Sequence, residues 1–440
     1  MTSRMPACTF VPPWLLARLG AERSLDLDDQ IRALRSARAA EPHVRAASAV
    51  GVSPWTVHDA DNATQLPGRP VRSAGQPTTV DVAVDEAAAG IEQTLAMFAS
   101  GFGRASYDDA GAPVTLVVHY GHDYANAFWD GRHLVFGDGD GMVFERLTKA
   151  GDVLAHEFGH AVIEHAAGLV YRDQPGALNE SLADVFAACF KQRLAGESAA
   201  EADWLIGEGL FVPGVRARAL RDMASPGTAF DDPALGSDPQ VAHLDDFVVT
   251  TDDNGGVHLN SGIPNRAFHL AATAIGGTSL EGAGQIWYSA LTRGGLRPDA
   301  DFSTFAAATV AAAGDHAEAV MQAWASVGVG LLPPRRPTGP PQEPADTPAP
   351  VPAVVRVRRS GGFAGRVQEG EIAVDARVRS LLERVDLDAA AASASTYRPM
   401  PDMFVYTFQI AAADPVTLPE QALTAGLHDL ATLVLGSDER

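Results

Sequence analysis

The HEFGH motif at residues 156–160 constrains this chain more than any other part of its sequence. It lies in the run GDVLAHEFGHAVIEHAAG, whose composition suits an α-helix that ends near Gly168. Positions i and i+4 share one face of a helix, so His156 and His160 point the same way. Two imidazoles with this spacing bind one zinc ion readily. The motif also occurs by chance in unrelated helices, so it does not establish a metal site alone.

A second predicted helix offers the remaining groups of such a site. The segment GALNESLADVFAACF is amphipathic, and it places Glu180 20 residues beyond His160. In an antiparallel helix pair Glu180 returns to the ion as a third ligand. Asp184, one turn further on, accepts the free N–H of a ligand histidine, and Asn179 is assigned a similar supporting role. The alternative is that Glu180 and Asp184 are solvated residues of an ordinary helix.

Three protein ligands leave one zinc position open for water, which is typical of a catalytic site. Zinc lowers the pKa of that water and polarises a carbonyl group. Glu157 lies between the two histidines, where it cannot reach the ion comfortably but can take the water's proton and pass it to a leaving amine. The expected reaction is amide hydrolysis without a covalent enzyme intermediate.

Composition excludes several other kinds of protein. The formal charge of −22 opposes binding to nucleic acid or to an anionic membrane. The sequence contains no apolar run of about 18 residues, so no membrane span is expected. The two cysteines, Cys8 and Cys189, do not form a disulfide framework. Because Pro12 and Pro13 break the apolar stretch near the start, a classical signal peptide is not expected either. The sequence therefore predicts a cytoplasmic protein, or one secreted by a non-classical route.

Changes in composition divide the chain into five parts. Residues 1–50 form a leading unit, interpreted as a removable pro-segment or, alternatively, as a structural arm. Residues 51–155 are rich in predicted strands and end in the helix of the HEFGH motif. They also include a predicted helix, DVAVDEAAAGIEQTLAMFASGFG, that is ended by Gly101 and Gly103, and a predicted hairpin turn at Asp130-Gly131. Residues 156–332 are mostly helical. Residues 333–352 form a proline-rich linker. Residues 353–440 form a small α+β domain, with predicted strands VVRVRRSGGF and MFVYTFQI and a predicted helix that has Pro419 near its start.

Four motifs together resemble those of the thermolysin-like metallopeptidases. They are NAFWDGRHLVFGDGDG, HEFGHAVIEH, GALNESLAD and DDNGGVHLNSGIPN, and the resemblance covers about residues 51–332. The short leading segment with its PP-W-L-L motif resembles the protealysin-type branch. The resemblance implies an α+β fold with two lobes, a β-rich N-terminal lobe and a helical C-terminal lobe. It also implies a zinc endopeptidase that acts on proteins or peptides, contains one catalytic Zn2+ and is made as a precursor.

The resemblance assigns roles to further residues. His258, oriented by Asp253, and Tyr171 are expected to donate hydrogen bonds to the oxyanion. Arg221 is expected to hold a substrate carbonyl. Taken alone, Tyr171 or Arg221 would be interpreted as a packing residue or part of a surface ion pair.

The substrate is expected to add a strand along Asn126 and the Ala127 backbone. An apolar pocket is expected to favour a bulky hydrophobic residue just after the cut bond, although core packing also explains such residues. The expected pocket residues are Phe144, Leu147, Val153, Ile206 and Leu220.

One departure from the family pattern concerns calcium. Asp152, Asp203 and Glu208 match the family's double calcium site, but Lys191 and Leu205 stand where carboxylates are expected. A lysine ammonium can neutralise these carboxylates without a metal. We therefore expect no calcium there, and a buried ion-pair cluster in its place. The GDGDG segment with Asp138 and Asp140 is interpreted as a turn.

Both ends of the chain are candidate regulators. Residues 353–437, through VRVRRSGGFAGRVQEGEI, LLERVDL and PDMFVYTFQI, resemble emfourin, a small inhibitor of protealysin-like proteases. The resemblance implies a tethered inhibitor, with Ser360–Gly365 as the expected contact segment; the alternative is a targeting or binding module. Near the other end, the thiolate of Cys8 could occupy the open zinc position of a precursor, although a buried inert thiol is the commoner role.

Overall fold

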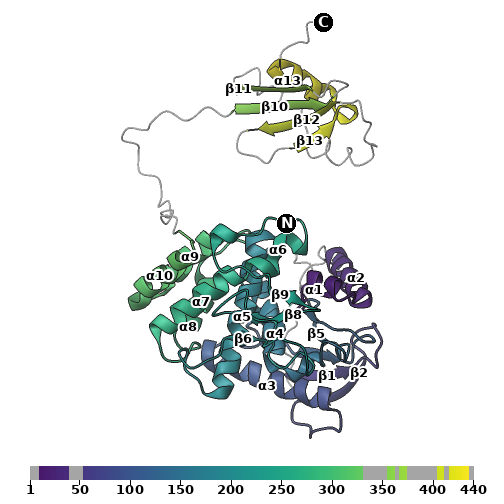
Figure 1. Cartoon of the computed structure of the whole chain (residues 1–440), viewed down its shortest axis with the longest axis vertical. Coiled ribbons are helices and arrows are strands. Elements are labelled where there is room, and N and C mark those ends of the chain that lie inside the picture. The colour runs from purple at the N-terminus through teal and green to yellow at the C-terminus, as the bar shows by residue number, and fades with distance from the viewer. Residues whose placement is uncertain are drawn as a thin grey trace. The chain divides into compact units, whose positions relative to one another are not determined.

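The structure is a computed structural model that describes residues 9–38, 53–330, 354–361, 366–373, 404–410 and 416–435. Contacts between Cα atoms divide the chain into two compact units, Met1–Arg336 and Pro337–Arg440, which are described separately (Figure 1). Three sequence predictions lie wholly or partly outside the described residues: the role of Cys8, the linker at residues 333–352 and the expected contact segment Ser360–Gly365.

The first unit contains a five-stranded sheet in the order β2-β1-β3-β5-β4. Its strands are β1 (Trp55–Asp59), β2 (Arg69–Ser73), β3 (Val114–Val118), β4 (Ala127–Trp129) and β5 (His133–Phe136). The apolar run of β3 lies in the middle, parallel to both neighbours, while β4 pairs antiparallel with β5 and forms an edge. The predicted hairpin at Asp130-Gly131 is confirmed. The Asp130 carboxylate accepts the N–H groups of Arg132 and His133 and thereby stabilises the turn.

A long helix packs against this sheet. Helix α3 (Val82–Phe102) begins where the Asp81 carboxylate accepts the N–H groups of Ala83 and Val84. It ends at Gly103, whose φ of 66° is the left-handed conformation that glycine adopts without strain. Both ends agree with the sequence prediction.

Two adjacent helices form the centre of the unit. Helix α4 (Gly151–His165) contains the HEFGH motif, and α5 (Asp173–Ala195) contains GALNESLAD. Both are almost entirely buried, because the sheet covers one side and further helices cover the other (Figure 1). A Cβ on Gly159 would lie 3.0 Å from the Ala183 Cα, so glycine at this position lets the two helices approach closely. The boundary expected at residues 155 and 156 falls inside α4.

The rest of the first unit is largely helical. Trp287, Phe305 and Trp324 pack against one another and join its last helices. The helices are α6 (Asp253–Asn260), α7 (Gly262–Ile275), α8 (Ala283–Arg293), α9 (Phe302–Ala312) and α10 (Ala317–Ser326), with short 3-10 turns η1 (Leu147–Lys149), η2 (Leu244–Asp246) and η3 (Gly314–His316). Short strand pairs are β6 (Leu205–Ile206) with β7 (Arg221–Asp222), and β8 (Asp231–Asp232) with β9 (Gly236–Ser237).

The N-terminal residues are built into this unit. Helix α1 (Pro13–Arg18) begins at a proline, whose fixed φ suits the first helical position, and α2 (Glu22–Arg38) follows. Leu15 and Leu16 are fully buried in the same hydrophobic cluster as the sheet and the central helices. In Figure 1 both helices, in purple, lie beside the β-rich part of the unit.

The second unit is a small α+β fold. Its strands β10 (Val354–Gly361), β11 (Arg366–Ala373), β12 (Phe404–Ile410) and β13 (Val416–Pro419) form an antiparallel sheet in the order β11-β10-β12-β13. Residues of α13 (Ala425–Leu435) pack on one face through a core that includes Val357, Phe408 and Leu430. Pro419 does not lie near the start of α13 as expected. It ends β13, and a 3-10 turn η4 (Glu420–Ala422) separates the two.

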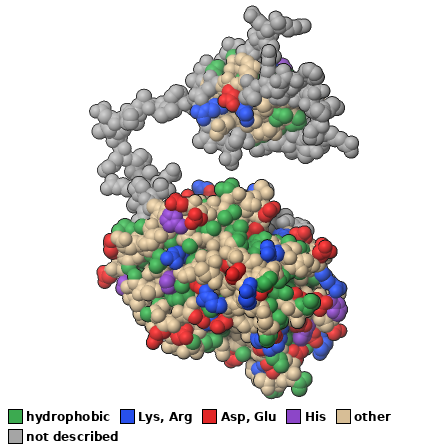
Figure 2. Space-filling view, viewed as in Figure 1, with side chains coloured by type: hydrophobic (Ala, Val, Ile, Leu, Met, Phe, Trp, Pro, Cys, Tyr) green, Lys and Arg blue, Asp and Glu red, His purple; other side chains and the backbone are tan. Residues whose placement is uncertain are grey.

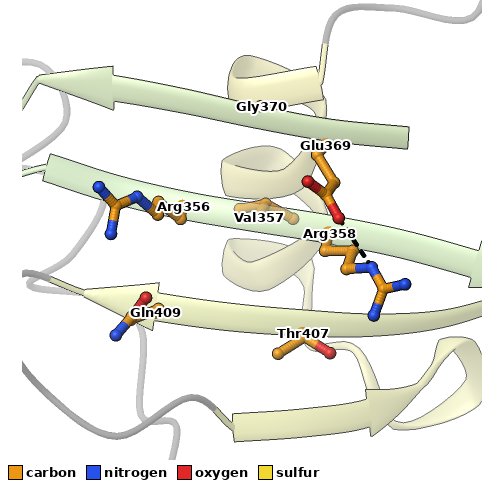
Figure 3. Close-up of a pocket in the computed structure, with 7 residues that line it drawn as sticks. All are labelled: Arg356, Val357, Arg358, Glu369, Gly370, Thr407 and Gln409. Carbon is orange, nitrogen blue, oxygen red and sulfur yellow. Dashed lines mark ion pairs between the residues drawn. The ribbon is translucent and has the colours of Figure 1, made fainter. Parts of the chain in front are cut away.

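The opposite face of this second sheet is polar. Figure 3 shows Arg356 and Arg358 from β10, Glu369 from β11, and Thr407 and Gln409 from β12, which line a shallow hollow. Arg358 and Glu369 form an ion pair with an N–O distance of 2.9 Å.

Two surface properties bear on possible partners. No helix in the described part of the chain is both long and apolar enough to cross a membrane. On the face of the first unit seen in Figure 2, acidic and basic side chains are interspersed.

Candidate active site

The three expected metal ligands converge in the structure. His156, His160 and Glu180 are buried, and each offers a ligand atom within 4.8 Å of those of the other two. The Nε2 atoms of the two histidines lie 2.9 Å apart. The Nδ1 atom of His156 faces Asp184 at 2.9 Å and that of His160 faces Asn179 Oδ1 at 2.8 Å, so each Nδ1 has an acceptor for its proton. Both Nε2 lone pairs then face the same point, an arrangement that suits one cation.

Charges around the site favour the metal-binding protonation states. Burial has the largest effect on His160 and lowers its pKa to about 3, which keeps its imidazole neutral. Burial would raise the pKa of Glu180, but positive charge nearby, that of His258 first, outweighs burial and lowers the pKa to about 2. Two imidazoles and one carboxylate form a donor set that zinc prefers, so the residues fit the metal.

Asp184 connects the metal ligands to a wider network. Its carboxylate accepts hydrogen bonds from the His156 ring at 2.9 Å and from the Asn265 amide at 2.8 Å. It also accepts hydrogen bonds from two nitrogens of the Arg221 guanidinium, each at 2.8 Å. Burial opposes its charge, but Arg221 outweighs burial and holds the pKa of Asp184 well below its usual range. Asn265 is a site residue to which the sequence assigned no role, and its available signal was its place at the end of the DDNGGVHLNSGIPN motif.

Glu157 lies on α4 between the two histidines and is fully buried. The same helix therefore positions both imidazoles and the carboxylate expected to move protons. A helix in the core holds such groups more rigidly than a loop does.

His258 and Asp253 form a pair beside the ligands. The His258 Nδ1 atom lies 2.7 Å from Asp253 Oδ1, and its Nε2 atom lies 3.5 Å from Glu180 Oε2. Burial lowers the pKa of His258, but Asp253 and Glu180 outweigh burial and raise it to about 9. A protonated His258 donates from both nitrogens. The Tyr171 hydroxyl lies 3.5 Å from His258 Nε2 and donates to Glu180 Oε1.

A glycine turn places His258 at the site. Within α6 the residues Asn254, Gly255 and Gly256 all have positive φ values, of 51°, 88° and 72°. A Cβ on Gly255 would lie 2.1 Å from the Asp173 carboxylate. Glycine is therefore required in the DNGG turn for two reasons, its φ and the close approach to α5.

The N-terminal segment occupies the edge expected to bind substrate. The Phe10 N–H donates to the Ala127 carbonyl at 3.0 Å, and the Val11 N–H donates to Asn126 Oδ1 at 2.7 Å. The Asn126 Nδ2 group donates back to the Val11 carbonyl at 3.0 Å. Thr9 and Phe128 form an antiparallel bridge. Residues 9–11 thus add a strand to the free edge of β4.

The Phe10 side chain is fully buried in the core cluster that contains all five expected pocket residues, Phe144, Leu147, Val153, Ile206 and Leu220. Its ring packs edge-on against His156 with a centroid distance of 5.0 Å, and the Arg221 guanidinium lies 4.5 Å from the ring centroid. The Arg221 Nη1 group also donates to the Phe10 carbonyl at 3.2 Å. The sequence predicted a role for Cys8 in this region and none for Phe10, whose signal was a lone bulky residue just before Val11 and two prolines.

The expected ion-pair cluster is only partly as predicted. The Lys191 ammonium contacts Asp203 at 2.8 Å and Glu208 at 2.7 Å, but Asp152 accepts the Gly207 N–H instead. The cluster is not buried: 25% of the Lys191 side chain and 50% of the Glu208 side chain are exposed. The lysine reaches its partners at the surface because its stem is long and its ammonium stays hydrated. In the GDGDG turn, the Asp140 carboxylate accepts three backbone N–H groups.

Comparisons with known proteins agree with this geometry. Residues 52–164 match the family model described as thermolysin metallopeptidase, catalytic domain, and residues 167–329 match thermolysin metallopeptidase, alpha-helical domain. The extracellular metalloprotease of Pectobacterium carotovorum subsp. carotovorum is 46% identical over 75% of this chain and 98% of its own length. Protease PrtS of Photorhabdus sp. (strain Az29) is 45% identical over 62% of this chain and 76% of its own. The solved precursor of protealysin, a metalloproteinase from Serratia proteamaculans, is 48% identical, with a TM-score of 0.66, over 73% of this chain and all of that one.

These names correct one expectation. The prediction of a cytoplasmic protein, or of one secreted by a non-classical route, is wrong, because relatives are named extracellular metalloprotease and, in Staphylococcus epidermidis, extracellular elastase. The apolar residues near the start are explained by packing. Phe10, Leu15 and Leu16 are fully buried in the first unit, so their apolar character says nothing about export.

The predicted fold class is confirmed, with a β-rich part followed by a helical part. The family implies one catalytic zinc, and the histidine, histidine and glutamate ligands for it lie together. The chain belongs to the thermolysin-like M4 metallopeptidases and is a zinc metalloendopeptidase.

Proposed function

We propose that this enzyme is made as a precursor and cuts protein substrates before a bulky hydrophobic residue. The main support is Phe10, which is fully buried beside His156 while Ala127 and Arg221 hold its backbone. A segment bound in this way marks where a substrate residue would lie. Its aromatic side chain indicates the kind of residue that the pocket accepts.

The proposed chemistry uses groups on two helices. His156, His160 and Glu180 would hold zinc, which when bound polarises the substrate carbonyl and makes a water molecule more acidic. Glu157 takes the proton of that water and passes it to the departing amine. Asn179 and Asp184 keep the histidine rings in the required tautomer and orientation.

Separate hydrogen-bond donors stabilise the negative charge of the transition state. His258, oriented by Asp253, donates to the oxygen of the attacked carbonyl, and Tyr171 is the proposed second donor. Arg221 binds the next carbonyl along the substrate. Asn126 and the Ala127 backbone pair with the substrate strand, which keeps the chain extended across the site.

The chain's own segments are proposed partners. Residues 1–50 are proposed as a pro-segment, supported by the binding of residues 9–11 and by similarity to a solved protease precursor. The enzyme is proposed to act outside the cell, as the names of its relatives say of those proteins. Residues 353–440, joined by the linker at 333–352, are proposed as a tethered inhibitor. Their resemblance to emfourin supports this role, and a targeting or binding module is the alternative.

The function is tested with full-length protein loaded with zinc and with peptides blocked at both ends. The peptides differ only in the residue after the central bond. We expect slow cleavage before Phe or Leu, since the chain's own segments restrain the site, and at least about 100-fold less before Asp or Lys, because an apolar pocket does not solvate a charge.

The matched control is Glu157→Gln, which should retain zinc and the wild-type melting temperature but lose cleavage by about 1,000-fold or more. A Glu157→Gln protein as active as wild type would contradict the mechanism. Cleavage that requires a free substrate N-terminus would contradict the endopeptidase assignment.

A further inference from the structure

The bound N-terminal segment is aligned with the site in a specific register. Residue 10 donates its N–H to Ala127, and residue 11 exchanges two hydrogen bonds with the Asn126 side chain. These are the groups proposed to pair with a substrate strand. Because successive residues of a strand meet fixed partners, this pairing determines which peptide bond of the segment lies at the metal site.

Two carbonyl groups identify that bond. The Thr9 carbonyl lies 3.0 Å from His258 Nε2, and the same Nε2 atom lies 3.5 Å from the predicted zinc ligand Glu180. The Phe10 carbonyl instead accepts from Arg221 at 3.2 Å. The carbonyl that faces the oxyanion donor and the metal ligands is therefore that of Thr9, so the bond at the reacting position joins Thr9 to Phe10.

The side chain after this bond also fits the proposed specificity. Phe10 is the bulky hydrophobic residue that the pocket is expected to prefer, and it is fully buried there. A Cβ on Gly207 would lie 3.3 Å from the Phe10 ring and 3.2 Å from Leu220, so Gly207 leaves room for the ring beside the expected pocket residue Leu220. The register of the pairing, the contacts of the two carbonyl groups and the buried Phe10 side chain all indicate that residues 9–11 lie in the site as a substrate would.

We propose that the enzyme cuts its own chain between Thr9 and Phe10, and that the cut segment stays bound and inhibitory. The proposal rests on the proposed function. One water molecule is consumed: its oxygen joins the Thr9 carbonyl carbon, the C–N bond breaks, and the products are a Thr9 carboxylate and a Phe10 amine.

Contacts on the Phe10 side of the bond explain why the cut does not release the segment. Hydrolysis frees Thr9 from His258 and from the bridge to Phe128. The two hydrogen bonds between Val11 and Asn126 remain, as do the buried Leu15 and Leu16 of α1 and the contacts of α2. Helix α2 places Asp28 against the Tyr124 hydroxyl at 2.6 Å and the Asn126 amide at 3.0 Å. The nicked segment keeps most of its interface, so dissociation is slow.

The test follows the N-terminus of the full-length protein. Zinc-loaded wild type is incubated, and intact mass with N-terminal sequencing is recorded over time. We expect a chain that begins at Phe10, at a rate independent of protein concentration because the bond lies in its own site. A size-tagged Glu157→Gln chain in the same tube should keep residues 1–9, and its cutting would overturn cleavage in cis.

Two substitutions at the pocket provide matched variants. Phe10→Leu keeps an apolar side chain and should be cut within about tenfold of the wild-type rate. Phe10→Asp should lower cutting at this bond by at least about 100-fold, because the carboxylate would lose its hydration in an apolar pocket whose nearby cation, Arg221, is already paired with Asp184. Phe10→Asp should also increase cleavage of a blocked peptide in trans, since the segment no longer fills the pocket.

A binding measurement independent of catalysis accompanies these rates. In metal-free Glu157→Gln protein, adding Phe10→Asp should lower the melting temperature by several degrees, whereas adding Phe10→Leu should lower it less. Equal melting temperatures for all three proteins would overturn the assigned register.

The outcomes separate this inference from the proposed function. One outcome is that wild type or Phe10→Asp cleaves the blocked peptide while wild type retains residues 1–9. That outcome would overturn the self-cleavage but not the proposed function. A zinc-loaded protein that cuts neither a peptide nor its own chain would overturn both.

Discussion

Two buried aspartates show how the partners of a carboxylate set its pKa. Asp184 faces the Arg221 guanidinium, which outweighs burial and keeps the pKa far below its usual range. Asp28 is equally buried, but the Tyr124 hydroxyl and the Asn126 amide that bond to it are neutral. Burial therefore dominates there and raises the pKa of Asp28 to about 7. Asp184 is ionised whenever the protein is folded, whereas Asp28 titrates near neutral pH.

We expect Asp28 to make docking of the N-terminal segment dependent on pH. Its pKa in the folded protein, about 7, exceeds the ordinary value of 3.8. Folding with the segment docked therefore binds a proton, so the stabilisation is fully present below about pH 4 and is lost as pH rises through 7. Asp28→Asn resembles the protonated acid, because its amide can donate to Tyr124 while its carbonyl accepts from Asn126. We expect the variant to be equal to wild type in stability at acid pH and more stable above pH 7.

Calorimetric melting of both proteins from pH 4 to 8.5, in a Glu157→Gln background, measures this difference. All other titrating groups are the same in both proteins and cancel in the comparison. Other charges near Asp28 are Arg32, which lowers its pKa, and Asp29, which raises it. Two stability curves that stay parallel over this range would contradict the assignment to Asp28.

At the scale of elements, helices α4 and α5 hold the predicted zinc ligands in rigid positions, and the turn at the start of α6 positions His258, the proposed oxyanion donor. Gly255→Ala places a methyl group where the Asp173 carboxylate lies and disfavours the φ of 88°. We expect His258 to move and kcat/KM for a blocked peptide to fall by about 100-fold, with zinc affinity unchanged.

Gly196→Ala is the matched control, since Gly196 has a φ of 70° at the end of α5 and no atom within 4 Å of an added Cβ. It should destabilise the protein by about 1 kcal/mol without changing kcat/KM. Equal losses of activity in both variants would show that general backbone strain, and not the position of His258, causes the effect.

The sequence predicted those elements whose signals are local. The spacing of His156 and His160 indicates one face of α4, and Asp130-Gly131 indicates the β4–β5 hairpin. The roles of His258 and Arg221 came from the family resemblance, because each contacts the site across more than 30 residues of sequence. Phe10 could not be placed, since its contacts with Ala127 and Arg221 depend on tertiary pairing that no local pattern encodes.

At the scale of the whole molecule, two segments of one chain are proposed to restrain one active site. The N-terminal segment is held by many contacts within the first unit. The C-terminal unit is joined through a proline-rich linker, residues 333–352, and so acts at an effective concentration set by linker length. For a linker of suitable reach that concentration is about millimolar, so even a weak inhibitor is effective while attached.

Tethered inhibition predicts a particular response to dilution. A recognition site for an outside protease is placed within residues 333–352 of the full-length Phe10→Asp variant, in which the N-terminal segment no longer fills the pocket. Before the linker is cut, activity per molecule on a blocked peptide should be low and independent of dilution, because inhibition is intramolecular. After the cut, activity should rise as the sample is diluted from micromolar to nanomolar, since the inhibitor dissociates by mass action.

The control is the same protein without the recognition site, treated with the same outside protease, which should stay at the low activity. A targeting module in place of an inhibitor would give equal activity before and after the cut at every dilution. That outcome would contradict the inhibitory role and leave the peptidase assignment unaffected, because the catalytic groups and the pocket all lie within residues 126–258. The two regulatory segments can therefore be tested one at a time on a single chain.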